Sequence, residues 1–150
     1  MARQLRHKGF QVWVEYRVVT ARGEWRPDLI VLVPPDKSGT LNPEAWVLDP
    51  TIVADNCEDL NTEHVKKCDK YSNLDVEAEV RRLTDTAGFV HYAGVVFNWR
   101  GIMAKDSIRE LLTMGMSRTD LEALCLTVVR GSAYIHQISQ LAKGRLPGAS

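Results

Sequence analysis

The stretch Arg26-Pro27-Asp28-Leu29-Ile30-Val31-Leu32-Val33 combines a turn, a carboxylate and an uninterrupted apolar run. Pro27 precedes the apolar run and Pro34-Pro35 follows it, so the run is only five residues long. A short apolar run between prolines is typical of a buried strand rather than a helix. The sequence therefore predicts a strand at 29–33, with Asp28 at its start, where an unpaired buried charge would be costly.

A second apolar stretch, at 45–53, contains a single aspartate, Asp49, which is followed directly by Pro50. The polar segment between the two stretches, 34–43, is predicted to be a hairpin loop. In an antiparallel hairpin the start of the first strand lies beside the end of the second, so we expect Asp28 to lie close to Asp49. Since proline removes a ladder donor, the second strand either lies at an edge near Pro50 or ends near Asp49.

The rest of the chain has clear strand and helix patterns. Segments rich in β-branched and aromatic residues predict strands, and apolar residues at three- and four-residue spacing predict helices. The expected elements are a strand at 10–19, a turn at 21–24, helices at about 58–72 and 75–84 (with cap residues at 55–59 and an end at Gly88), a strand at 89–97, and helices after Ile102. Ser117 and Asp120 have the spacing of a capping box.

This order of elements predicts an α/β or α+β protein with a mixed β-sheet flanked by helices and a helical C-terminal layer. At 150 residues the chain is long enough for one well-packed core. We expect a single domain over 1–150, with its core at about 9–100 and its C-terminal helices at about 102–143.

Composition excludes several classes of protein. Apolar residues make up 45% and charged residues 25% of the chain, as in an ordinary soluble globule. No apolar run approaches the ~18 residues of a membrane span, and the polar start does not resemble a signal peptide, so an intracellular location is expected. Cys57, Cys68 and Cys125 are too few for a disulfide framework and lack zinc-site spacing.

Charge is unevenly distributed although the net charge is zero. Residues 1–26 carry a balance of +4, residues 27–99 a balance of −7, and residues 100–150 a balance of +3. An acidic middle between basic ends suits a metal-binding centre with phosphate-contacting flanks. Chance unevenness of solvated surface charge explains the pattern equally well.

A lysine cluster adds to the two expected carboxylates. Lys66, Lys67 and Lys70 lie on the helix predicted to follow the Asp49 strand. Two adjacent carboxylates repel each other, and a shared cation would explain their proximity. Mg²⁺ needs only one or two carboxylates when a substrate phosphate completes its shell, and a lysine stabilises developing negative charge. The pattern favours metal-dependent phosphodiester hydrolysis, with Glu15 on the preceding strand as a third candidate ligand.

Each of these residues also has an ordinary structural explanation. Asp28 is suited to a turn after Pro27, and Asp49 to capping the following loop. The lysines are suited to a solvated helix face, and Glu15 to a solvent-facing strand position. The ordered combination, rather than any one residue, favours the nuclease interpretation.

Several segments in this order resemble the restriction-like endonuclease domain of site-specific non-LTR retrotransposons, a branch of the PD-(D/E)XK nuclease superfamily. They are Val12-x-x-Glu15, Arg26-Pro27-Asp28, Val47-Leu48-Asp49-x-Thr51-Ile52-Val53-x-Asp55, Lys67-x-x-Lys70-Tyr71, Gly94-Val95-Val96-Phe97-x-x-Arg100-Gly101 and Leu111-Leu112-x-x-Gly115-Met116-Ser117. The resemblance covers roughly Gly9 to Gln140, which is most of the chain.

The resemblance implies roles for individual residues. Asp28 would be the aspartate of the PD motif, and Asp49 the acidic residue of the (D/E)XK motif. In this branch the lysine is displaced onto the following helix, which implies Lys67 and Lys70 as catalytic lysines, with the adjacent Lys66 as an alternative assignment. Thr51 stands where a lysine would otherwise be. Mg²⁺ or Mn²⁺ would be the cofactor, held by Asp28 and Asp49, with Glu15 assisting.

The resemblance also implies a biological setting. Such domains nick target DNA beside a reverse transcriptase in the same polypeptide, which implies a nuclear location and DNA as the partner. Because no polymerase precedes the domain, the chain is expected to be a truncated element or a fragment, with element RNA or a reverse transcriptase supplied elsewhere as further partners and no membrane partner. The alternative is a catalytically degenerate copy that binds nucleic acid or protein, because Pro50 replaces a usual β-branched residue. A third interpretation is an interaction domain that uses the helices after Ile102.

Overall fold

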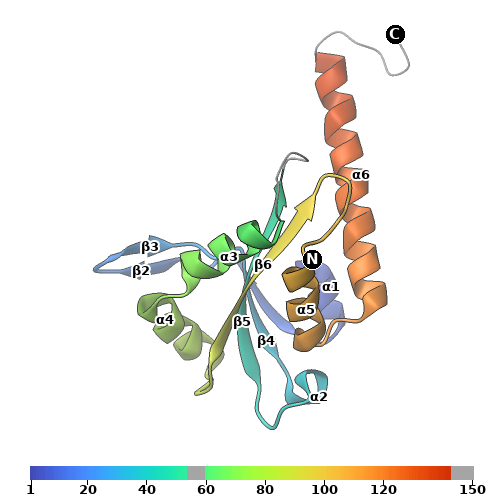
Figure 1. Ribbon diagram of the computed structural model, residues 1–150. Coiled ribbons are helices and arrows are strands. Elements are labelled where there is room, and N and C mark those ends of the chain that lie inside the picture. The colour runs from blue at the N-terminus through green and yellow to red at the C-terminus, as the bar shows by residue number, and fades with distance from the viewer. Residues whose placement is uncertain (54–59, 143–150) are drawn as a thin grey trace.

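The computed structural model describes residues 1–53 and 60–142, and it contains a mixed sheet between two layers of helices (Figure 1). Its elements are, in chain order, α1 (Ala2–His7), β1 (Gln11–Val14), β2 (Val18–Thr20), β3 (Gly23–Trp25), β4 (Leu29–Val33), α2 (Pro35–Ser38), β5 (Glu44–Val53), α3 (Leu60–Tyr71), α4 (Leu74–Thr84), β6 (Val90–Asn98), α5 (Lys105–Met114) and α6 (Arg118–Ala142). The expected α+β class, with a mixed sheet flanked by helices, is confirmed.

The main sheet has the strand order β1-β4-β5-β6. β4 pairs antiparallel with both β1 and β5, whereas β5 pairs parallel with β6. The parallel pairing requires a crossover, and α3 and α4 provide it. β2 and β3 form a separate two-stranded hairpin beside this sheet.

The apolar run of β4 is buried on both faces of the sheet. Leu29, Val31 and Val33 pack into one hydrophobic cluster, and Ile30 packs into the other. Because side chains alternate between the faces of a strand, an uninterrupted apolar run fits only a strand that is covered on both sides. The predicted strand at 29–33 is confirmed with the same bounds.

Helices cover both faces of the sheet (Figure 1). On one face, α1, α5 and α6 contribute Leu5, Leu111 and Leu124 to the cluster around Trp46. On the other face, α3 and α4 contribute side chains to the cluster around Ile30 and Val47; these are Tyr71, Val76 and Val80. The second half of α6 projects beyond the sheet in Figure 1. No helix in the described part of the chain is long and apolar enough to cross a membrane.

The open edge of β6 is covered by the segment that begins α5. The Val96 amide donates to the Ser107 hydroxyl at 3.1 Å, and that hydroxyl donates to the Gly94 carbonyl. The Ala104 amide donates to the Val96 carbonyl at 2.9 Å. Backbone groups that would otherwise be exposed at a sheet edge are therefore satisfied within the protein.

The single strand expected at 10–19 is wrong, because the chain leaves the sheet after Val14. Glu15 has a φ of 49°, in the left-handed region, and this ends β1. Val18–Thr20 belongs instead to the hairpin with Gly23–Trp25. The expected turn at 21–24 is correspondingly reduced to its first two residues, Ala21 and Arg22.

Two further expectations, on the loop at 34–43 and on the end of the helix at 75–84, need correction, and a third concerns residues that the structure does not describe. The loop at 34–43 contains the short helix α2, which begins at Pro35, a favourable first helical position for proline. The helix predicted at 75–84 is present, but it ends at Asp85, a left-handed C-cap, rather than at Gly88. The cap residues at 55–59, with Cys57, lie outside the described residues.

Pro50 does not end its strand. β5 continues to Val53 and pairs with β6 from Ala45 to Val53, with Pro50 beside Val95. The pairing with β4 stops at Leu48, so beyond this point β5 has a neighbouring strand on one side only among the described residues. Of the two alternatives for Pro50, the edge position is confirmed, and an end near Asp49 is wrong.

The predicted capping box at the start of α6 is confirmed. The Asp120 amide donates to the Ser117 hydroxyl at 3.2 Å, and the Ser117 amide donates to the Asp120 carboxylate at 2.7 Å. Lys8, next to α1, also donates to this carboxylate at 2.6 Å. Burial opposes ionisation of Asp120, but these donors outweigh it and lower its pKa to about 2.

Asp120→Asn should therefore destabilise the protein at neutral pH. Because folding lowers the pKa of Asp120, its ionised form stabilises the fold above about pH 4, and this contribution is lost as the pH falls towards 2. We expect a loss of about 1–2 kcal/mol at pH 7, measured by urea unfolding, that shrinks towards pH 2. A loss of equal size at both pH values would contradict this account.

Candidate active site

Asp28 directly precedes β4, and it lies opposite Asp49 of β5, the antiparallel neighbour of β4. Leu29 pairs with Leu48, so the next position outward along the two strands brings Asp28 beside Asp49. Both share the side-chain face of Ile30 and Val47, which α3 and α4 cover. Directly opposed side chains have Cβ atoms about 4.5–5.5 Å apart. The predicted proximity of the two carboxylates is confirmed.

The two carboxylates have different environments. Asp49 is 4% exposed, and within the described residues its Oδ2 atom accepts no hydrogen bond. Asp28 is half-buried, and its pKa is raised to about 6 by burial and then by a hydrogen bond and repulsion from Asp49. The positive charges of Lys70 and Lys67 act in the opposite direction. The pair therefore carries excess negative charge that the protein only partly compensates.

Lys67 is the lysine that contacts the pair. Its Nζ atom lies 3.3 Å from Oδ2 of Asp49, and its side chain is only 24% exposed. The distance is that of an ion pair, but the Oδ2 atom still lacks a hydrogen bond of good geometry. Lys67 therefore offsets part of the charge on Asp49 without fully satisfying its buried oxygen.

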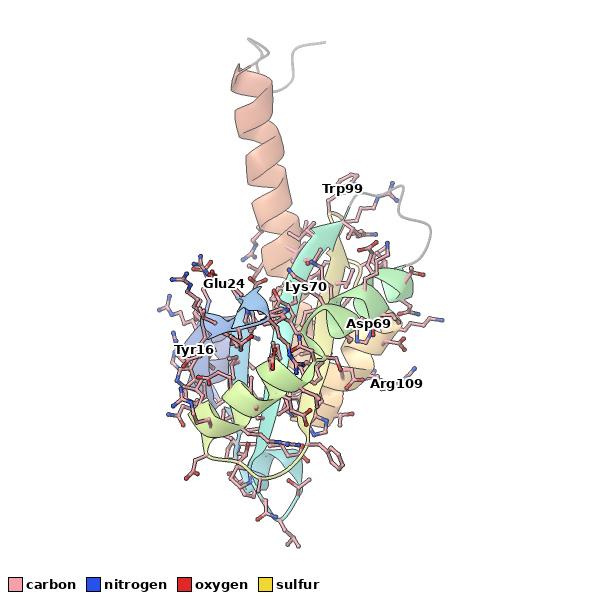
Figure 2. All side chains as sticks on the ribbon, turned by 90° about the vertical axis from the view of Figure 1, so that its left-hand side faces the viewer. Tyr16, Glu24, Asp69, Lys70, Trp99 and Arg109 are labelled. Carbon is pink, nitrogen blue, oxygen red and sulfur yellow. The ribbon has the colours of Figure 1, made fainter. Side chains whose placement is uncertain are left out.

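The other two lysines of the cluster differ from each other. Lys70 is exposed and acts electrostatically on both Asp28 and Asp49. Figure 2 shows Lys70 and Asp69 on α3, on the face of the molecule turned toward the viewer. Lys66 instead pairs with Glu63 at 2.9 Å along the helix. The geometry therefore favours Lys67 and Lys70 over Lys66 as partners of the carboxylates.

A glycine in β6 lets α3 approach the sheet closely enough for this contact. Gly94 lies beside Asp49 in the parallel register. A Cβ atom at Gly94 would lie 2.8 Å from the Cβ atom of Lys67 and 3.1 Å from the backbone of His64. Any larger residue would therefore push the helix, and Lys67 with it, away from Asp49. A glycine within a strand pattern is the sequence signal for such a close approach.

Glu15 contributes its backbone to this edge of the sheet. Its amide donates to the Asp28 carbonyl at 2.9 Å, and its side chain is exposed. Among residues 1–53 and 60–142, no three His, Cys, Asp or Glu side chains are grouped so that they could hold a metal ion. The structure thus brings Asp28 and Asp49 together but does not bring the Glu15 carboxylate to them, and its role as a ligand stays a prediction.

The chemistry of the pair fits a divalent cation. A cation between the carboxylates would remove their repulsion and give Oδ2 of Asp49 a partner. Carboxylate oxygens are ligands that Mg²⁺ prefers, and two suffice when water and a substrate phosphate complete its shell. Asp28 and Asp49 are the residues that would hold the ion.

An apolar groove of about 610 Å³ lies elsewhere, between the segment before α5 and helix α6. Its lining includes Ile102, Leu121 and Val129, with Arg100 and Arg118 among the polar residues. α6 packs on the sheet face opposite to the one that carries the two aspartates. The groove is therefore separate from the candidate site.

Comparisons with known proteins connect the chain to retrotransposons. No protein-family model matches it. It is 30% identical, over 131 residues, to the retrovirus-related Pol polyprotein from type-2 retrotransposable element R2DM of Drosophila melanogaster. It is 27% identical, over 125 residues, to the corresponding polyprotein from type-1 retrotransposable element R2 of Bradysia coprophila.

These matches cover most of this chain but little of each relative. They include 87% and 83% of the chain, which span 12% and 13% of the Drosophila and Bradysia polyproteins, respectively. The homology to R2 polyproteins supports a retrotransposon origin for the chain.

Gly94→Ala tests whether close packing of α3 sets the position of Lys67. We expect a loss of about 1–3 kcal/mol in unfolding free energy, because the added methyl group overlaps Lys67 and the His64 backbone. Gly88→Ala is the matched control, since a Cβ atom there meets nothing within 4 Å. Urea unfolding measures both variants, and equal stabilities would contradict the packing argument.

Asp28→Asn tests the repulsion within the carboxylate pair. Because folding raises the pKa of Asp28 to about 6, the folded protein binds a proton between about pH 4 and 6 that the unfolded chain has released. Stability should therefore fall as the pH rises through this range in EDTA. The variant lacks this loss, and it should be more stable than the parent by on the order of 1 kcal/mol at pH 7.5 but not at pH 4. A less stable variant at pH 7.5 would contradict the argument.

Proposed function

We propose that the chain is a metal-dependent DNA endonuclease domain of retrotransposon origin, with a PD-(D/E)XK restriction-endonuclease-like fold, that nicks DNA by phosphodiester hydrolysis. The observation that carries this proposal is the proximity of the Asp28 and Asp49 carboxylates next to the Leu29–Leu48 pair, with Lys67 3.3 Å from Asp49. The similarity to R2 polyproteins supports the retrotransposon part of the proposal. DNA as substrate and the nucleus as location rest on the family resemblance.

The carboxylates and the lysines of the site would have different roles in hydrolysis. Asp28 and Asp49 would hold Mg²⁺ or Mn²⁺, which when bound supplies charge relief on the phosphate and a more acidic water. Lys67 holds the buried Asp49 carboxylate in place through its ion pair. Lys70 is more exposed, so its ammonium group is available to a phosphate that approaches from solvent.

The contact between Lys67 and Asp49 also favours a second candidate function. A lysine that offsets part of the charge on a carboxylate can take the place of a metal ion, which would leave a degenerate copy of the fold that binds nucleic acid or protein without cutting. DNA binding that persists in EDTA, with no cleavage in Mg²⁺ or Mn²⁺, would select this function over the first.

Nicking of supercoiled plasmid in Mg²⁺ or Mn²⁺ tests the proposed nuclease. Asp28→Asn and Asp49→Asn should each reduce nicking by at least about a hundredfold, because each removes a ligand charge without changing side-chain volume. Lys67→Gln should also reduce nicking, since it removes the charge nearest to Asp49.

Matched controls lie on the same helix. Asp69→Asn removes an exposed carboxylate, and Lys66→Gln removes a lysine that pairs with Glu63. Both should nick like the parent. If Asp28→Asn and Asp49→Asn nick as fast as these controls, the two aspartates are not the catalytic pair.

A further inference from the structure

Tyr71, the last residue of α3, lies between the two parts of the candidate site. It is 3% exposed, and its ring packs in the cluster with Ile30 and Val47. Its hydroxyl group reaches out of this cluster and donates to the Arg26 carbonyl at 3.1 Å. Nothing in the sequence pattern reveals this hydroxyl contact.

The hydrogen bond from Tyr71 holds the backbone segment that directly precedes Asp28. Arg26 and Pro27 belong to neither β3 nor β4, so no strand ladder fixes the chain there. The Tyr71 hydroxyl ties this segment to α3, two residues before Asp28. On the other side of Asp28, the strand is fixed by the pairing of Leu29 with Leu48. The backbone is thus held after Asp28 by the pairing of Leu29 with Leu48, and before Asp28 by the Tyr71 hydroxyl group.

Tyr71 also contacts Lys70. The Lys70 Nζ atom lies 4.9 Å from the centroid of the Tyr71 ring, a distance at which a cation is attracted to the ring face. Lys70 in turn acts electrostatically on both Asp28 and Asp49. One buried side chain therefore touches the segment that carries a candidate metal ligand and the lysine that faces the same pair.

We propose that Tyr71 is a positioning residue, whose hydroxyl bond to the Arg26 carbonyl sets the place of Asp28 relative to Asp49 and so determines how tightly the pair binds a divalent cation. This inference rests on the proposed function. A metal site whose ligands are misplaced by about 1 Å binds its ion weakly. A single hydrogen bond that fixes the backbone next to a ligand can therefore have a large effect on metal affinity.

Tyr71→Phe removes this hydrogen bond, and with it the interaction of the hydroxyl group with Lys70, but it keeps the ring that packs in the core and under Lys70. The concentration of Mn²⁺ that gives half-maximal plasmid nicking should rise about tenfold, which corresponds to the loss of one hydrogen bond. The nicking rate at saturating Mn²⁺ should change by less than about twofold, because the lysines and the ring are retained. Mn²⁺ affinity measured by calorimetry, without DNA, should weaken by the same factor.

Tyr92→Phe is the matched control. Tyr92 lies in β6 beside Val47, and its buried hydroxyl group has no hydrogen-bond partner among the residues that the structure describes. Removing this hydroxyl group should change neither the half-saturating Mn²⁺ concentration nor the calorimetric affinity. The two variants thus compare the loss of a bonded hydroxyl group with the loss of an unbonded one on rings that pack in the same hydrophobic cluster.

The outcomes separate this inference from the proposed function. If the parent neither nicks plasmid nor binds Mn²⁺, the proposed function fails. If the parent does both and Tyr71→Phe matches Tyr92→Phe, the positioning role is overturned. A lower nicking rate in Tyr71→Phe at every Mn²⁺ concentration, with unchanged Mn²⁺ affinity, also overturns it, because that result indicates a general structural effect.

Discussion

The site depends on the register between β4 and β5. Pairing of Leu29 with Leu48 sets Asp28 against Asp49, and a shift by one residue would turn one of the two carboxylates to the opposite face. The apolar pattern fixes this register, because Leu29 and Leu48 must face one cluster while Ile30 and Val47 face the other. The packing of the core therefore determines the geometry of the carboxylate pair.

This arrangement is unfavourable for the protein alone. Burial and the neighbouring Asp49 raise the pKa of Asp28 to about 6, and Oδ2 of Asp49 is buried with no hydrogen bond from the described part of the chain. Lys67 compensates only in part, and its approach requires Gly94 beneath the helix. Proteins accept such local costs at functional sites, where a ligand relieves them.

Sequence reasoning predicted the parts of this site that local patterns encode. Prolines and a short apolar run defined β4, and the antiparallel hairpin brought Asp28 to Asp49. It missed the end of β1, because the left-handed conformation there is adopted by Glu15 and not by a glycine, the residue that usually signals it. It also missed the hydroxyl contact of Tyr71, because a hydrogen bond to a carbonyl 45 residues away has no local pattern. The choice between Lys66 and Lys67 required the helix orientation, which depends on Gly94.

A Mn²⁺ titration monitored by electron paramagnetic resonance tests the central claim, that Asp28 and Asp49 form one divalent-cation site. Free Mn²⁺ is counted directly, so the measurement gives stoichiometry and affinity without DNA or turnover. The account predicts one ion bound per chain, displaced by excess Mg²⁺ and lost in Asp49→Asn but retained in Asp69→Asn. Absence of binding at millimolar Mn²⁺, or equal binding by the two variants, would contradict it.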